Sequence, residues 1–166
     1  GAASGHSHKP GIEGCPGSMA MDFRAGEKDG GQQAHEGKVA SQLRQWPIQL
    51  HLVSPQAPYY QGADVLLSAD CVAFTLGGFH PDYLKGKSLA IACPKLDEGQ
   101  EVYVEKTMSL IDDAKINTLT VMIMQVPCCR GLLQLAQTAA QQAKRKMPIK
   151  LIVVGIQGDI LSEEWI

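Results

Sequence analysis

After Trp46 the chain alternates between short aliphatic runs and longer stretches with helical spacing, and this alternation restricts its possible folds most strongly. Short runs rich in Val, Ile and Leu predict strands of a parallel sheet, because such strands are covered on both faces. The helical stretches between them predict crossover connections. We expect strands at 48–53, 65–69 with a continuation through 74, 88–92, 119–126 and 149–156.

Two helices are expected between the last three of these strands. Residues 101–116 place Val104, Met108 and Ile111 near one face at helical spacing. Residues 132–143 are rich in Leu and Ala, which suits a helix packed closely against a sheet. The pattern predicts a three-layer Rossmann-like or flavodoxin-like α/β domain, with a mostly parallel sheet of about five strands and crossover helices.

The chain of 166 residues is long enough for one domain with a sizeable core. We assign residues 44–166 to the cysteine-containing α/β domain. Residues 1–43 are rich in Gly, His and charge, and are expected to form a flexible arm or linker. Within this arm His6, His8 and Cys15 lie close together in sequence, a grouping that suits either a metal site or a linker.

Composition excludes several classes of protein. Hydrophobic residues make up 45% of the chain and charged residues 19%, with a formal net charge of −2, so nothing indicates nucleic-acid binding. No apolar run approaches the roughly 20 residues needed to cross a bilayer, and the N-terminus lacks a secretory pattern. We therefore expect a soluble, cytoplasmic protein without membrane contact.

The familiar catalytic and nucleotide-binding motifs are not found. Gly86, Lys87 and Ser88 resemble the end of a phosphate-binding loop, but Pro81 stands where its first glycine would be and a strand follows. Pro81 and Gly86 instead suit the start and end of a short helix. The sequence holds no GxGxxG, HExxH or GxSxG, so hydride transfer, zinc proteolysis and serine hydrolysis lack support.

Four of the five cysteines follow predicted strands. Cys71 comes after the second strand, Cys93 ends the third, and Cys128 and Cys129 follow the fourth. Because the carboxyl ends of parallel strands share one edge of a sheet, these four thiols are expected to meet there. The odd number of cysteines and the lack of a secretory signal favour thiols, thiolates or metal ligands over a disulfide framework.

Two interpretations of the cysteine group remain open. Cys128 and Cys129 open a helix, and Arg130 is adjacent, so their environment favours thiolates that would bind an iron–sulfur cluster or zinc. Free cysteine is also among the most buried residue types, so the four could simply pack as small apolar side chains. Because consecutive side chains diverge, one of the adjacent pair is expected to ligate and the other to pack.

Other polar residues fall near the same predicted edge. His80 is a candidate ligand or proton donor, or a surface residue, and Arg130 is a candidate cofactor contact. Asp70 and Asp97 stand near cysteines and either tune a site or form turns. His51 is expected to be packed within the first strand.

The segments GCPGS, LRQWPIQLHLV, ADCVAF, LAIACPKLD and VPCCRG carry a family resemblance. From about Cys15 to Leu161 the chain resembles the C-terminal domain of bacterial and archaeal ferredoxin-like iron–sulfur cluster-binding proteins, found mostly in anaerobes. Members commonly carry an N-terminal ferredoxin module with 4Fe-4S clusters, and the present sequence has no CxxCxxC run that would hold them. The resemblance implies that Cys15 joins the four strand-end cysteines as a position of the family pattern.

Three hypotheses follow for function. The first is an accessory or electron-transfer domain of an anaerobic iron–sulfur protein, whose sheet-edge thiolates bind a cluster or metal and whose partner is a redox protein or an attached ferredoxin module. The second is an enzyme with a reactive cysteine thiolate that acts on a small molecule. The third is a metal-free interaction domain whose cysteines only pack.

Overall fold

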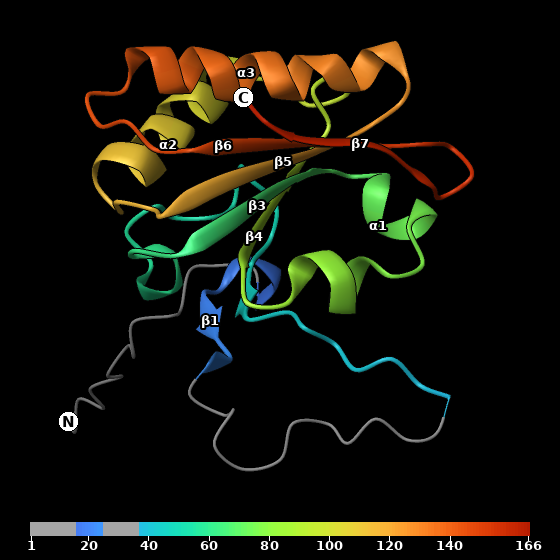
Figure 1. The fold of residues 1–166 in the computed structure, drawn as a ribbon. Helices are drawn as coiled ribbons and strands as arrows, with labels where there is room; N and C mark the ends of the chain where they lie inside the picture. Colours follow the sequence, from blue (N-terminus) through green and yellow to red (C-terminus); the bar gives the residue numbers. More distant parts are fainter. Residues whose placement is uncertain (1–15, 25–36) are drawn as a thin grey trace, which may run out of the picture.

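The computed structural model describes residues 16–24 and 37–166. Its main sheet has five strands in the order β4-β3-β5-β6-β7 (Figure 1). Four of them are parallel neighbours, and β7 is antiparallel to β6. The strands are β3 (Asp64–Ala69), β4 (Ser88–Ala92), β5 (Thr118–Met124), β6 (Ile149–Val154) and β7 (Ile160–Trp165).

Helices cover the sheet on both faces. Figure 1 shows α2 (Gln100–Asp112) and α3 (Arg130–Gln142) side by side on one face, where they contact each other. The other face carries the shorter α1 (Val72–Thr75) and the π-helical turn η4 (Phe79–Leu84), which together join β3 to β4. These three layers confirm the predicted Rossmann-like α/β architecture with a mostly parallel sheet of five strands.

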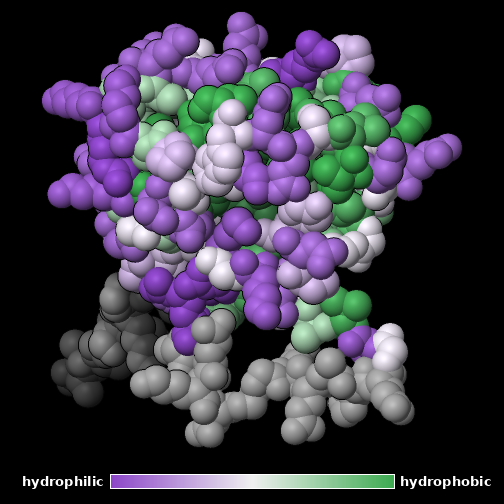
Figure 2. Space-filling view, in the orientation of Figure 1, coloured by the Kyte–Doolittle hydropathy of each residue, from purple (hydrophilic) through white to green (hydrophobic). Residues whose placement is uncertain are grey.

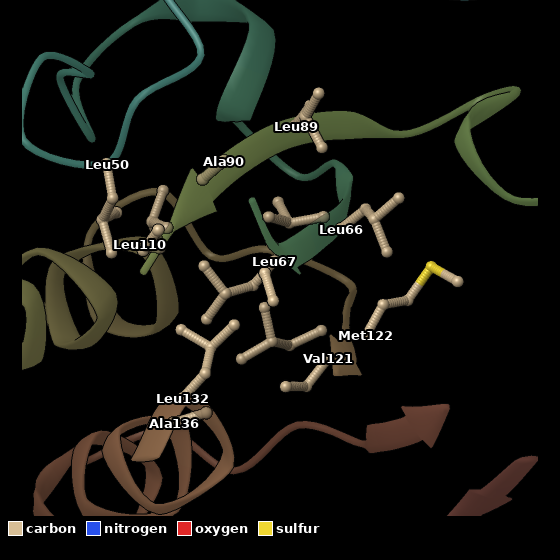
Figure 3. Packing of buried hydrophobic residues seen from close by; sticks show 14 of the residues in the cluster. Leu50, Leu66, Leu67, Leu89, Ala90, Leu110, Val121, Met122, Leu132 and Ala136 are labelled. Atoms are coloured by element: carbon tan, nitrogen blue, oxygen red, sulfur yellow. The ribbon is translucent and has the colours of Figure 1, made fainter. Parts of the chain in front are cut away.

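The core follows from the alternation of side chains along the central strands. Leu67 and Val121 are register partners on β3 and β5 and point toward Leu132 of α3, whereas Leu66 and Met122 point to the opposite side of the sheet (Figure 3). All five side chains are buried. Burial of an aliphatic side chain of this size contributes about 1.5–3 kcal/mol, so both faces of the sheet stabilise the fold.

The outer edge of β4 is covered by the segment that precedes β3. The side chain of Gln45 accepts a hydrogen bond from the Leu89 N–H at 3.1 Å and donates one to the Leu89 carbonyl at 2.5 Å. The Ile91 N–H donates to the Ile48 carbonyl at 2.8 Å, and the Leu50 N–H donates to the Ile91 carbonyl at 2.9 Å. These contacts satisfy backbone groups that would otherwise be an open template for strand pairing. The 3₁₀ turn η3 (Pro58–Tyr60) completes this cover.

The predicted strand at 48–53 is wrong. Only an isolated bridge joins Gln49 to Ile91, and a turn follows. The ammonium of Lys106 on α2 donates to the carbonyls of Leu50 and Val53 at 3.0 and 2.9 Å. These carbonyls are bound to a side chain, so they do not take part in a strand ladder.

Three other expectations need correction. The continuation of the second strand through 74 is wrong, because Phe74 lies in α1 with 94% of its side chain exposed. His51 is exposed rather than packed within a strand, and its ring stacks on Tyr103 with the centroids 4.1 Å apart. The edge strand β7 was not expected, because its exposed, polar pattern lacks the apolar signal of a buried strand.

Part of the predicted N-terminal arm contacts the domain. The short strand β1 (Met21–Asp22) pairs antiparallel with β2 (Gln45–Trp46). The indole N–H of Trp46 donates to the carbonyl of Gly17, within the 3₁₀ turn η1 (Pro16–Ser18), at 2.7 Å. The predicted metal grouping of His6, His8 and Cys15 lies outside the described residues. Among the helices that the structure describes, none is long and apolar enough to span a membrane.

Candidate functional site: a cysteine-lined cavity

The strand order creates a crevice at the carboxyl edge of the sheet. After β3 the chain turns toward α1 on one face, and after the neighbouring β5 it turns toward α3 on the other. Connections that leave adjacent parallel strands in opposite directions separate from each other, and ligands of open α/β sheets bind in the gap. The gap between the ends of β3 and β5 is therefore the expected ligand-binding position of this fold.

A cavity of about 270 Å³ lies at this point. Residues from the ends of β3, β4, β5 and β6 surround it, and no Lys, Arg or His is among them. Its lining consists of Ala69, Asp70, Cys71, Thr75, Cys93, Pro94, Met124, Val126, Cys128, Cys129 and Ile156. The wall is thus mostly apolar, with four thiols and one carboxylate as its reactive groups.

The four strand-end cysteines meet in this cavity, although they come from three separate loops. Cys71 precedes α1, Cys93 follows β4, and Cys128 and Cys129 belong to the 3₁₀ turn η5 (Pro127–Cys129) that leads into α3. All four are free thiols. Cys129 is buried, Cys71 and Cys128 are exposed, and Cys93 is intermediate. The adjacent pair therefore diverges in burial, as their consecutive positions predict.

The expectation of a thiolate at the start of α3 does not hold for Cys129. Burial raises the pKa of this thiol, and the neighbouring Cys128 and Cys71 sulfurs raise that pKa further. A hydrogen bond with the Met124 backbone acts in the opposite direction and is outweighed. The loss of solvation dominates here, so this thiol is protonated at neutral pH unless a cation joins it.

A hydrogen-bond network holds the Cys93 loop. The carboxylate oxygen Oδ2 of Asp97 accepts a hydrogen bond from the Cys93 N–H at 2.8 Å and a second from the hydroxyl of Tyr103. The N–H of Asp97 in turn donates to the Cys93 carbonyl at 2.9 Å. Burial and the Asp97 carboxylate raise the pKa of the fully buried Tyr103, so its hydroxyl stays protonated as a donor. The network fixes the backbone that carries the Cys93 sulfur.

Asp70 places the only carboxylate on the described cavity wall. Its N–H donates to the Ala92 carbonyl at 3.2 Å, which ties the end of β3 to the end of β4. Its Oδ1 atom is buried and has no hydrogen-bond partner among the described residues. Burial, followed by the negative charge of Asp97, raises the pKa of Asp70, while a hydrogen bond with the Gln49 side chain lowers it.

Two further candidates, His80 and Arg130, are not among the residues that line the cavity. His80 lies in η4, and its Nδ1 accepts a hydrogen bond from the Gln42 N–H at 3.0 Å. Arg130, the first residue of α3, is exposed, and Cys15 lies outside the described residues. Within the described ranges no three His, Cys, Asp or Glu side chains are already grouped closely enough to hold a single metal ion. Thr75 and Ile156 also line the cavity, and no motif in the sequence indicated them.

Fold and site together define an α/β domain with a thiol-lined cavity at its strand-order reversal. The chain belongs to the Rossmann-like domain family, whose family model matches residues 57–166. A protein of Archaeoglobus fulgidus, described as an uncharacterized protein, is 26% identical over 120 residues, which cover 72% of this chain and 83% of the relative. No solved structure gives a significant match. Neither description names an iron–sulfur protein.

Proposed function

We propose that the cavity binds an iron–sulfur cluster through cysteine sulfurs and that the domain serves electron transfer in an iron–sulfur protein. One observation carries the proposal: four free cysteines from three loops line a single cavity at the site where this fold binds ligands. Several cysteine ligands are the common feature of iron–sulfur sites. The resemblance of the cysteine-bearing segments to iron–sulfur cluster-binding proteins supports the same assignment.

The size and charge of the cavity favour an inorganic cofactor over a nucleotide or another organic ligand. Its volume of about 270 Å³ is below the usual range of roughly 300–1,000 Å³ for pockets that hold small organic molecules. A phosphate group would meet the Asp70 carboxylate and no cationic side chain on the described wall. A positively charged metal centre would instead be attracted by the sulfurs and the carboxylate.

The arrangement of the sulfurs favours a cluster over a single zinc ion. Four thiolates on one tetrahedral zinc stand about 3.8 Å apart, because each Zn–S bond is about 2.3 Å long. A cluster contains several metal atoms, so its ligands surround a wider space. Among the described residues no three His, Cys, Asp or Glu side chains are close enough to hold one metal ion, so cysteines on the loops after β3, β4 and β5 suit this second arrangement better.

Exposed apolar side chains near the cavity support a docking partner. Phe74, Leu96 and Ile156 are 94%, 79% and 66% exposed. Phe74 lies in α1, which follows β3, and the other two stand on the loops that follow β4 and β6. Figure 2 shows hydrophobic atoms gathered on the right of the view, the side on which α1 lies in Figure 1. Apolar groups around a redox site are suited to contact with a redox protein or an attached ferredoxin module.

Iron and acid-labile sulfide analysis tests the proposal directly. The wild-type protein, purified and reconstituted without oxygen, is compared with Cys71→Ser/Cys128→Ser, because both thiols are exposed and their replacement should not disturb folding. We expect iron and sulfide in the wild type and their loss in the double variant. The matched control, Cys15→Ser, removes the cysteine that lies outside the described residues.

The outcomes separate the alternatives. Iron and sulfide that persist in Cys15→Ser but not in the double variant place the cluster in the cavity. Loss in Cys15→Ser alone would move the site to the N-terminal segment. A wild-type protein that takes up neither iron nor sulfide would refute the cluster and leave the packing interpretation, in which the domain only binds partners.

A further inference from the structure

Asp70 lies on the wall of the cysteine cavity, where a backbone hydrogen bond holds it. It directly follows β3, and its N–H donates to the Ala92 carbonyl at the end of β4. Cys71 is the next residue, and Cys93 directly follows Ala92. The Asp70 carboxylate therefore lies between two of the sulfur-bearing loops, on the wall of the cavity.

The Oδ1 atom of this carboxylate is a buried acceptor without a hydrogen-bond partner among the described residues. The Gln49 side chain hydrogen-bonds the carboxylate group, but the Oδ1 atom itself is left without a partner there. A buried carboxylate oxygen without a donor or cation is costly, and such atoms in native proteins call for a specific explanation. The described cavity wall offers no cationic side chain, and the nearby Asp97 carboxylate adds negative charge. A cation bound in the cavity beside the cysteine sulfurs would therefore be stabilised by the Asp70 carboxylate.

We propose that Asp70 Oδ1 is a direct oxygen ligand of the metal centre, alongside the cysteine sulfurs. This inference rests on the proposed function, since it assigns a ligand to the same centre. The class of metal follows from the mixed donor set: iron accepts both thiolate and carboxylate ligands. A harder oxygen ligand binds the sulfur-rich centre less firmly than a thiolate would, so the iron at Asp70 is the most readily exchanged one.

Substitutions at Asp70 test the ligand role. Wild-type protein, Asp70→Asn and Asp70→Cys are reconstituted anaerobically with ferrous iron and sulfide. Iron and sulfide per chain are measured, and iron release to EDTA is followed by the loss of visible absorbance. The matched control is Asp64→Asn, which removes a carboxylate from the opposite end of β3, where it accepts hydrogen bonds from Asn117 and Thr118. Urea unfolding of the metal-free proteins checks that each variant is folded.

We expect Asp70→Asn to release iron at least about tenfold faster than the wild type, because loss of even an outer-shell partner of a metal ligand costs roughly 10–100-fold in metal affinity. Asp70→Cys should release iron more slowly than Asp70→Asn, because a thiolate restores a ligand at the same position. Asp64→Asn should match the wild type. A purely structural role of Asp70 would not produce this rescue by cysteine.

Three results would overturn the inference, each in a recognisable way. Release from Asp70→Asn at the wild-type rate would show that Asp70 is not a ligand, while the bound cluster would still support the proposed function. Equal acceleration in Asp64→Asn would show a general effect of charge. A wild-type protein that binds no iron and sulfide would refute the proposed function itself.

Discussion

The contact between Tyr103 and Asp97 gives a quantitative test of how the Cys93 loop is held. Asp97 Oδ2 accepts one hydrogen bond from the Cys93 N–H and one from the Tyr103 hydroxyl, and Tyr103 is fully buried. Hydrogen bonds to a charged group contribute about 1.5–3 kcal/mol each. Because Asp97 is partly exposed, we take the lower value for both bonds. Asp97→Ala should then lower the free energy of unfolding by about 3 kcal/mol.

A double-mutant cycle isolates the contribution of the hydroxyl. Tyr103→Phe alone removes one of the two bonds and should cost about 1.5 kcal/mol. In the Asp97→Ala background the hydroxyl has already lost its acceptor, so Tyr103→Phe should cost nothing further. The double variant is therefore expected to lose about 3 kcal/mol rather than the additive value of about 4.5 kcal/mol.

Urea unfolding at neutral pH measures all four corners of this cycle, and an unchanged m value shows that the transition is comparable among variants. Glu98→Ala is the matched control, because Glu98 is exposed and its backbone carbonyl, the acceptor for His51, is retained. It should change stability by no more than about 0.5 kcal/mol. A coupling energy between Asp97 and Tyr103 below about 0.5 kcal/mol would refute the network as a stabilising unit.

Two further predictions concern the cover of the cavity and the edge of the sheet. Gly158 has φ of +88°, and a Cβ there would stand 2.6 Å from the Thr75 carbonyl oxygen. Gly158→Ala should therefore lower the free energy of unfolding, measured by thermal unfolding, by about 1–3 kcal/mol. The control Gly77→Ala, where a Cβ would meet open space, should lower it by about 1 kcal/mol or less. Burial raises the pKa of Tyr60, whose hydroxyl donates to the Leu89 carbonyl. Above the unfolded-state pKa of about 10 the unfolded chain binds fewer protons, so Tyr60 alone should lower wild-type stability by up to about 1.4 kcal/mol per pH unit. Tyr60→Phe should flatten this alkaline slope, and an unchanged slope would contradict the argument.

Buried elements were the most predictable part of the fold. The predicted strand at 88–92 coincides with β4, and those at 65–69, 119–126 and 149–156 correspond to β3, β5 and β6 within two residues at each end. The reason is that both faces of these strands are covered, so nearly every position must be apolar. The crossover helices α2 and α3 were predictable for a related reason, since each has a face that packs on the sheet.

The two edges of the sheet were less predictable, because the side chains there contact solvent or partners that are distant in the sequence. The residues of segment 48–53 include the apolar–polar alternation of a strand, and Leu50 and Val53 are buried. The carbonyls of these two residues are nevertheless bound by Lys106, more than 50 positions away in the chain. Strand β7 is almost wholly exposed, and its Glu163 pairs with Lys150 of β6. Neither contact leaves a local pattern in the sequence.

The candidate site divides in the same way between topology and packing. Position at a strand end was enough to predict that Cys71, Cys93, Cys128 and Cys129 would share one edge, because parallel strands all end there. The position of a cysteine at a strand end does not show how deeply its side chain is buried, and burial changes the pKa of the thiol. Cys129 is buried with a raised pKa, whereas its neighbour Cys128 is exposed. The unpartnered Asp70 oxygen arises only when β3 and β4 are tied together and the loops close around it. The metal centre proposed above would stabilise the charged forms of both the Cys129 sulfur and the buried Asp70 oxygen, because a nearby cation offsets their loss of solvation.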